Sequence, residues 1–268
     1  MLEICISTYG ERVNRLANLP TFLNCRYLII HQAYNQTELT NCLIDRFSKG
    51  DISIIKSDTI GLTKSRNEAV KYSTGKLLLI SDDDVLYSND LVNKILLSKE
   101  KFDFDIALFK ASVSGDTSDF RVYPNQTKKL GRVDCLHACS IEMVLDRRVI
   151  EHNQELFNIN FGIGSEFLCG EESILLFDML RKKKNLYFIN EYIVSHPKES
   201  TATGSINVDE VLKAKGAVYR YGFGFFLGFI LMLRLAFFNS MPRIINQTKV
   251  TCFRKLSVGF FLMKKFIN

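Results

Sequence analysis

Residues 77–87 read LLLISDDDVLY, an apolar run that ends in three consecutive aspartates. The apolar part is typical of a strand that is buried on both faces of a sheet. Adjacent carboxylates repel one another, and each loses hydration if it points into a cleft. Aspartates are also favoured at a helix N-terminus, but the next helix has its own capping residues at 88–90. The stretch therefore predicts a strand end that carries a functional acidic cluster.

The three aspartates suit a divalent cation. In an extended segment alternate side chains share a face, so we expect Asp82 and Asp84 to point the same way. Carboxylate oxygens are preferred ligands of Mg²⁺ and Mn²⁺, and such an ion would also neutralise a diphosphate. We predict that Asp82 and Asp84 hold this metal and that Asp82 and Asp83 contribute to nucleotide-diphosphate binding.

The sequence around this strand alternates strand-like and helix-like segments. Strand-like patterns occur at 2–7, 26–31, 51–56, 76–80 and 104–109. Helix-type spacing occurs at 13–23, 38–47, 63–72 and 91–99. Further on, the patterns predict a strand leading into a helix at 140–149, a helix at 171–184 and a strand at 186–194. This order predicts an α/β domain with a mostly parallel sheet flanked by helices, whose ligands bind at the carboxyl ends of the strands.

The end of the 268-residue chain has a different composition. From residue 217 onward there are eight Lys or Arg, no Asp or Glu, and ten of the 21 phenylalanines. The uncharged run at 221–233 is shorter than the roughly 20 apolar residues that a spanning helix needs. Aromatic and basic residues without acids favour a helix lying in a lipid headgroup layer. We expect a domain at 1–205 and a membrane-associated helical tail at 206–268, with a true span or a protein contact as alternatives.

The partner classes and the compartment follow from the same composition. The tail mixes its aromatic residues with Leu, Ile and Met, so we do not expect it to bind nucleic acid. The seven cysteines form no CxxC pair, and the first residues enter a strand-like run without a secretory signal. These features predict reduced cysteines and a cytoplasmic protein.

Two segments near the strand ends contain candidate ligand-binding residues. In GLTKSRNEAVKYSTGK (61–76), Lys64, Arg66 and Asn67 lie near a helix start, where cations and free N–H groups can hold phosphate or a sugar hydroxyl. In ISTYGER (6–12), Thr8, Tyr9 and Glu11 offer a hydroxyl, a stacking ring and an acceptor to a nucleotide base. The alternatives are a solvated amphipathic helix and an ordinary loop with a helix cap.

Two later segments contain further candidates. In FLCGEESILLFDML (167–180), Glu172, and less favourably Glu171, could be a general base whose pKa is raised by the neighbouring carboxylate. The alternative is that both acids only complement a helix dipole. His196 is a candidate third metal ligand or diphosphate contact, with a structural histidine as the alternative.

The motifs STYGER, GLTKSRNEAV…STGKLLLISDDDV and GEES, in this order, resemble the family 2 glycosyltransferases with the GT-A fold, especially bacterial enzymes that build surface polysaccharide. The resemblance covers about residues 1–200 and implies a Rossmann-like sheet. It also implies inverting transfer from a nucleotide-diphosphate sugar, most often a UDP-sugar, with Mn²⁺ or Mg²⁺. The acceptor would be a hydroxyl of a saccharide or an undecaprenyl-linked saccharide at the inner face of the cell membrane.

The resemblance assigns roles and marks two departures. Glu172 would be the base, and Lys64 or Arg66 would assist the leaving diphosphate. Ser81 stands where the family's D-x-D-D signature begins, which moves the principal metal role towards Asp83 or Asp84. Glu172 stands where the family commonly has aspartate. The alternatives are a nucleotidyltransferase that makes a nucleotide-sugar, and a non-catalytic, membrane-tethered sugar-binding module.

Overall fold

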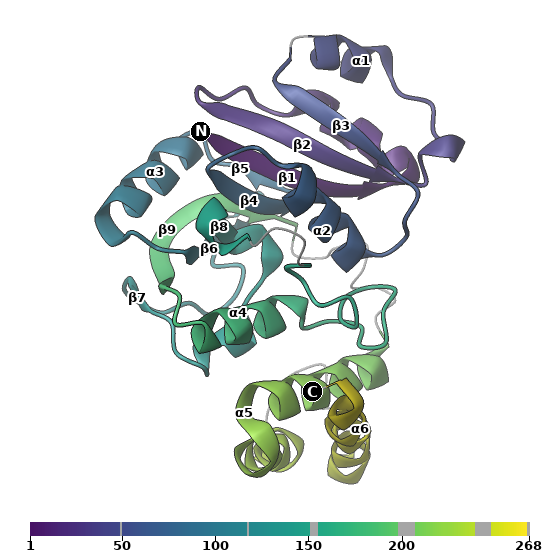
Figure 1. Cartoon of the computed structure of the whole chain (residues 1–268), viewed down its shortest axis with the longest axis vertical. Helices are drawn as coiled ribbons and strands as arrows, with labels where there is room; N and C mark the ends of the chain where they lie inside the picture. The colour runs from purple at the N-terminus through teal and green to yellow at the C-terminus, as the bar shows by residue number, and fades with distance from the viewer. Residues whose placement is uncertain (49, 117, 151–154, 198–206, 239–247, 267–268) are drawn as a thin grey trace.

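A mixed nine-stranded sheet forms the centre of the protein, with the order β3-β2-β1-β4-β8-β6-β9-β5 and with β7 paired to β9 (Figure 1). The computed structural model describes residues 1–48, 50–116, 118–150, 155–197, 207–238 and 248–266. Four neighbouring strands are parallel, namely β1 (Leu2–Tyr9), β2 (Cys25–Gln32), β3 (Ile52–Ser57) and β4 (Leu77–Asp82). The remaining strands are β5 (Leu86–Tyr87), β6 (Ile106–Val113), β7 (Lys128–Lys129), β8 (Met143–Asp146) and β9 (Leu186–His196). The predicted α/β sheet is confirmed.

Helices cover both faces of the sheet because alternate strand residues point to opposite sides. They are α1 (Asn41–Ser48), α2 (Leu62–Tyr72), α3 (Leu91–Phe102) and α4 (Glu171–Arg181). Ile4 and Ile6 of β1 belong to the hydrophobic cluster that includes residues of α1 and α3. Cys5, between them, belongs to the cluster on the opposite face with α2 and α4.

Two segments expected to be α-helical form shorter structures. The segment at 13–23 is instead a 3₁₀ helix at Gly10–Asn18, followed by extended Leu19 (φ −56°, ψ 136°). Pro20 explains this end, because a residue before proline is disfavoured in the α conformation. At 140–149 the strand β8 is confirmed, but only the 3₁₀ turn Arg147–Val149 follows it. The other 3₁₀ turns are Tyr34–Gln36, Asp134–His137, Ser140–Glu142 and Met263–Phe266.

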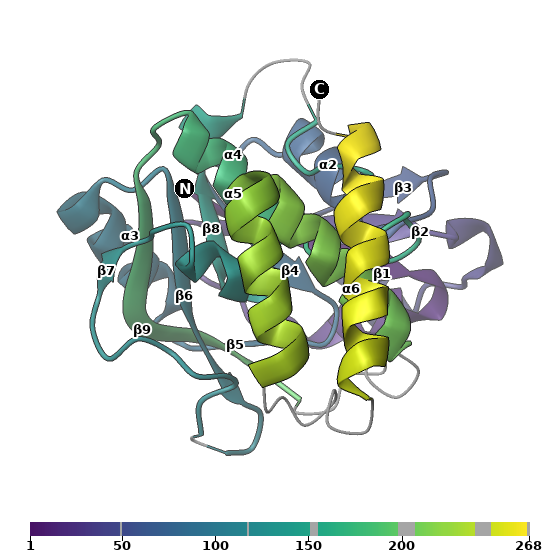
Figure 2. The same ribbon diagram turned by 90° about the horizontal axis from the view of Figure 1, so that it is seen from below.

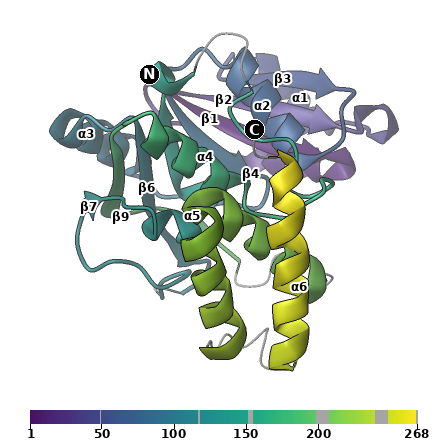
Figure 3. The ribbon, with the colours of Figure 1, turned by 60° about the horizontal axis from the view of Figure 1, so that its bottom comes forward.

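The described part of the tail is a helical hairpin made of α5 (Val208–Phe238) and α6 (Lys249–Leu262), which lies beneath α4 (Figures 1 and 2). Figure 3 shows α6 and the second half of α5 side by side. A Cβ atom at Gly216 of α5 would lie 1.9 Å from the carbonyl oxygen of Leu256 in α6. The two backbones therefore touch where only glycine fits.

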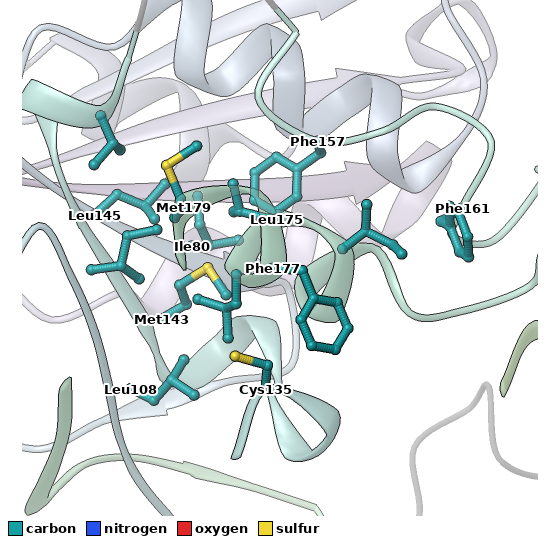
Figure 4. Packing of buried hydrophobic residues seen from close by; sticks show 14 of the residues in the cluster. Ile80, Leu108, Cys135, Met143, Leu145, Phe157, Phe161, Leu175, Phe177 and Met179 are labelled. Atoms are coloured by element: carbon teal, nitrogen blue, oxygen red, sulfur yellow. The ribbon is translucent and has the colours of Figure 1, made fainter. Parts of the chain in front are cut away.

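The hairpin packs on the α4 side of the sheet. Figure 4 shows Leu175 and Met179 of α4 among sheet residues that include Ile80 and Met143. Phe177 of α4 contacts α5, since a Cβ atom at Gly222 would lie 2.3 Å from its ring. The described tail thus shares a core with the sheet, while the expected domain boundary at 205/206 lies outside the described residues.

Candidate active site

The parallel register of β1 and β4 brings the acidic triplet to the end of β1. Ser7 lies beside Asp82, so Thr8 and Asp83 come next to each other. The Thr8 hydroxyl donates to Asp83 Oδ2 at 2.7 Å, and the Arg12 guanidinium donates to Asp83 Oδ1. The Asp83 carboxylate is buried at the base of this cluster.

The expected alternation of the three aspartates stops after Asp82. β4 ends at Asp82, and Asp83 and Asp84 form the turn that follows. Arg12 Nη2 lies 3.5 Å from Asp84 Oδ2 as well as beside Asp83, whereas Asp82 Oδ1 lies 3.5 Å from Arg66 Nη2. Because of this turn, Asp82 lies near Arg66, whereas Asp83 and Asp84 lie near Arg12. If the strand had continued, Asp82 and Asp84 would have shared one face.

Arg66 links the triplet to the acidic pair of α4. Its side chain is 3% exposed, and Nη1 lies 2.7 Å from Glu171 Oε1 and 3.3 Å from Glu172 Oε1. Nη2 donates to Ser140 Oγ at 2.7 Å. Two acidic motifs about 90 residues apart in the chain thus meet at one buried guanidinium.

Glycine at position 170 allows this approach of α4. Gly170 has φ +108°, a region that favours glycine, and a Cβ atom there would lie 2.5 Å from Val218 of α5. The hairpin therefore packs directly behind the residue that precedes Glu171 and Glu172. Burial raises the pKa of Glu172 to about 8, and the charge of Glu171 contributes in the same direction.

The surroundings of Asp83 and Asp84 shift their pKa values in opposite directions. Burial raises the pKa of Asp83 above its usual range despite the bonds from Thr8 and Arg12. His196 Nε2 lies 3.0 Å from Asp84 Oδ1. This hydrogen bond lowers the pKa of Asp84 and raises that of His196. His196 is thus brought to the acidic triplet, as the sequence hypothesis requires.

The remaining predicted site residues have different surroundings. Tyr9 is half exposed at the end of β1, so its ring is free to stack. Glu11 accepts from Asn14 at 3.2 Å. Asn67 is engaged with the loop after β8, because its side chain exchanges two 2.8 Å hydrogen bonds with the backbone of Phe157. Lys64 lines a cleft of about 1180 Å³ beside α2, whose lining includes neither the acidic triplet nor the α4 pair.

Two residues of the site were missed from the sequence. Arg12 is the last residue of ISTYGER, and the need of three adjacent aspartates for a nearby cation was the signal that could have assigned it. Ser140, the partner of Arg66, lies in a segment with no recognisable motif. Only the fold brings Ser140 to the site.

The residues present can share a metal with a substrate. In the described residues no three His, Cys, Asp or Glu side chains are grouped so that they could hold an ion by themselves. Mg²⁺ in phosphate-containing sites is commonly bound by one or two carboxylates and by substrate phosphates. Asp82 Oδ1 is buried without a hydrogen-bond partner, and Asp84 is partly accessible. This donor set fits an ion that arrives with a diphosphate.

Comparisons with known proteins identify the fold and the family of the chain. The chain superposes on S. aureus TarS 1–349 in complex with UDP-GlcNAc with a TM-score of 0.60 and 14% identity, covering 93% of this chain and 74% of that one. For the complex of the same protein with UDP the TM-score is 0.60 and the identity 14%, with coverage of 92% and 75%. No curated protein sequence is significantly similar. The model of the family described as glycosyl transferase family 2 matches residues 4–180, and the chain therefore belongs to this family of glycosyltransferases.

Proposed function

We propose that the chain is an inverting, metal-dependent glycosyltransferase that moves a sugar from a UDP-sugar to a hydroxyl of a saccharide or lipid-linked saccharide acceptor. The observation that carries this proposal is the meeting of two acidic motifs at Arg66, which lies within 3.5 Å of Asp82, Glu171 and Glu172. In an inverting transfer, the group that stabilises the leaving diphosphate and the group that activates the acceptor lie on opposite sides of the anomeric carbon. The likeness to structures holding UDP-GlcNAc and UDP supports the choice of donor.

The chain's own residues suggest how a diphosphate would be held. Asp84 and Asp82, with His196 beside Asp84, would hold Mn²⁺ or Mg²⁺. When bound, such an ion would stabilise the negative charge that develops on the leaving diphosphate. Thr8 and Arg12 fix the buried Asp83 at the base of the cluster. The exposed ring of Tyr9 is available to the nucleotide base.

Glu172 is the group we assign to the acceptor. It is more exposed than Glu171 (14% against 5% of the side chain) and makes the longer contact with Arg66. Its carboxylate would take the proton of the acceptor hydroxyl as the oxygen attacks the anomeric carbon. The new C–O bond forms as the bond to the diphosphate breaks, and UDP leaves with the electron pair. A single displacement from the opposite face inverts the anomeric configuration.

The hairpin would bring the enzyme to a lipid-linked acceptor at the inner face of the cell membrane. α5 is, within the described ranges, the one helix long and apolar enough to pass as a membrane segment. In its most apolar 18-residue window only 28% is buried in the protein, which a soluble core helix would not tolerate. The acids of α5, Asp209 and Glu210, lie in its first turn, and from residue 217 onward the sequence has Arg and Lys but no Asp or Glu, which favours an anionic lipid surface.

The test is a screen of nucleotide sugars for Mn²⁺- or Mg²⁺-dependent hydrolysis, followed by transfer assays with saccharide and lipid-linked acceptors. We expect one or a few UDP-sugars to be turned over, with faster consumption when the acceptor is present. Product analysis by NMR would report the anomeric configuration. Retention of configuration, or turnover unaffected by EDTA, would contradict the mechanism.

A further inference from the structure

A sharp bend divides the long apolar helix of the hairpin. Gly224 has φ 74° and ψ −165°, which is not helical, so α5 consists of two helices at 208–223 and 225–238. A Cβ atom at Gly228 would lie 2.5 Å from the carbonyl oxygen of Tyr219. In a straight helix these two positions would be roughly 13 Å apart along the axis. The second half of α5 is therefore turned sharply back at Gly224 (Figures 2 and 3).

Neither half of α5 can cross a bilayer. At 1.5 Å per residue the halves are about 24 and 21 Å long, against a hydrocarbon core of about 30 Å. α6 is antiparallel to the second half, because Phe237 packs on Phe253 and Phe225 packs on Phe260, with centroids 6.0 and 5.8 Å apart. Backbone contact between Gly259 and Lys213 fastens α6 to the first half. The described hairpin is a closed unit rather than a spanning rod.

The outer surfaces of both helices are apolar, with cations between the apolar residues. On α5 the exposed stripe has Phe226 and Ile230, then Arg234, then Phe238 at four-residue spacing. On α6 it contains Val250, Arg254, Val258 and Phe261, and Lys265 follows in the 3₁₀ turn Met263–Phe266. Phe225 joins the two stripes, since its ring lies 5.5 Å from that of Phe226 and 6.5 Å from that of Phe261.

The position of the cations decides how such a surface can meet lipid. Arg234 lies four residues from Ile230 and four from Phe238, and Arg254 lies likewise between Val250 and Val258. If the hairpin plunged along the bilayer normal, these guanidinium groups would enter the hydrocarbon region. If the helices lie in the plane of the membrane, both of these guanidinium groups reach the headgroups while the apolar neighbours enter the acyl boundary.

From this geometry we infer that the α5–α6 hairpin lies in the plane of one leaflet of an anionic bilayer and does not cross it. Phe226, Ile230 and Phe238 enter the acyl boundary to similar depth, and Arg234 and Arg254 contact anionic headgroups. This inference rests on the proposed membrane association and specifies its mode. Because α5 packs tightly on Gly170 and Phe177, it holds α4, the helix that begins with Glu171 and Glu172, at a fixed height above the acceptor lipid.

Tryptophan fluorescence can test the depth because the chain contains no Trp. Phe226→Trp, Phe238→Trp and the control Leu97→Trp would be made in the full chain, since all three side chains are exposed and none is part of the packed core. Each protein is mixed with phosphatidylglycerol vesicles containing lipids brominated near the headgroup or near the chain end. We expect both hairpin variants to be quenched roughly threefold more by the shallow bromines, to the same extent, and Leu97→Trp to be unquenched.

Each other result has a defined meaning. Strongest quenching by chain-end bromines at either position would overturn the in-plane arrangement while leaving membrane association intact. No vesicle binding by any variant would overturn both the inference and the proposed membrane association. Concentration-dependent self-association in place of vesicle binding would identify the surface as a contact between copies of the chain.

A charge variant tests the headgroup contact independently. Arg254→Glu should weaken binding to phosphatidylglycerol vesicles roughly 25-fold, since each basic residue near an anionic surface contributes about fivefold and charge reversal counts this factor twice. Lys101→Glu, which makes the same change on α3, should leave binding unchanged. Equal losses in the two variants, or binding of the wild-type chain that is equally strong to phosphatidylcholine vesicles, would contradict the role of the cations.

Discussion

The acidic triplet at the end of β4 and the acidic pair that begins α4 are stabilised against charge repulsion in different ways. In both, like charges are adjacent in the sequence and partly or fully buried. The triplet gives each carboxylate a separate main partner, with Arg66 at Asp82, Thr8 and Arg12 at Asp83, and His196 at Asp84. The pair shares one cation, because Glu171 and Glu172 both face Arg66.

This difference favours the different roles that we propose for the two clusters. The hydrogen bond from His196 keeps the pKa of Asp84 below its usual range, so Asp84 is ionised at neutral pH and can bind a cation. The pKa of Glu172 is raised to about 8 by burial and by Glu171, so it can exchange a proton near neutrality. A carboxylate with a partner of its own is thus suited to binding a cation, and a carboxylate that shares its partner is suited to transferring a proton.

Removing the base should have the largest effect. Glu172→Gln should lower kcat by about 10³-fold or more, because a positioned general base contributes up to about 10⁴-fold. Calorimetric UDP affinity should stay within a few fold of the wild type, since we propose that Glu172 faces the acceptor and not the nucleotide. If UDP binding is lost together with transfer, Glu172 is not simply a base.

Removing a carboxylate of the triplet should have the second largest effect on transfer. Asp84→Asn should lower metal-dependent transfer by about 10²- to 10³-fold, as the loss of several kcal/mol of transition-state stabilisation requires. The apparent affinity for Mn²⁺ should fall at the same time, in contrast with Glu172→Gln. Asp116 is an exposed aspartate near the end of β6 and serves as a control. Asp116→Asn should leave both the transfer rate and the apparent Mn²⁺ affinity unchanged. Near-normal turnover of Asp84→Asn would count against the metal role.

Removing the shared cation should damage both clusters at once. Arg66→Gln leaves Glu171 buried without its cation, so we expect a loss of about 3–5 kcal/mol in the free energy of unfolding by urea denaturation. In protein that still folds, kcat should fall roughly 10- to 100-fold. Arg66→Lys keeps the charge and should recover part of both losses. A large loss of UDP affinity in either variant would instead indicate that Arg66 contacts the nucleotide directly.

The pH dependence of transfer should separate the two glutamates. A base with a pKa of about 8 must be deprotonated to act, so kcat should rise about tenfold between pH 7 and 9. Removing the neighbouring charge in Glu171→Gln lowers the pKa of Glu172, so the rise should move to lower pH. Arg66→Gln should move it to higher pH. If Glu171→Gln abolishes transfer at every pH, Glu171 is the base.

The sequence predicted the sheet and the candidate motifs because both depend on local patterns. Apolar runs ending in polar residues located β1 and β4, and parallel pairing then placed Thr8 beside Asp83. The turn at Asp83 could not be predicted, because it depends on where β4 stops pairing with β1. The bend at Gly224 was also missed, since a glycine within an apolar run is compatible with a straight helix.

Ser140 provides the finest test of the comparison, because no sequence motif marked it and its side chain accepts a hydrogen bond from the shared cation, Arg66. Ser140→Ala removes the acceptor of Arg66 Nη2 and leaves a buried donor unpaired, at a cost of about 1–2 kcal/mol in unfolding free energy. Ser73→Ala is the control, because Ser73 accepts from Arg147 at 2.9 Å in a similarly buried position away from the site and also donates to the Val70 carbonyl at 2.8 Å. Ser73→Ala should therefore lose at least as much stability as Ser140→Ala in urea titrations, but only Ser140→Ala should lower kcat, by a factor of roughly two to five. Equal kcat values for the two variants would show that Arg66 is held in place by the carboxylates alone.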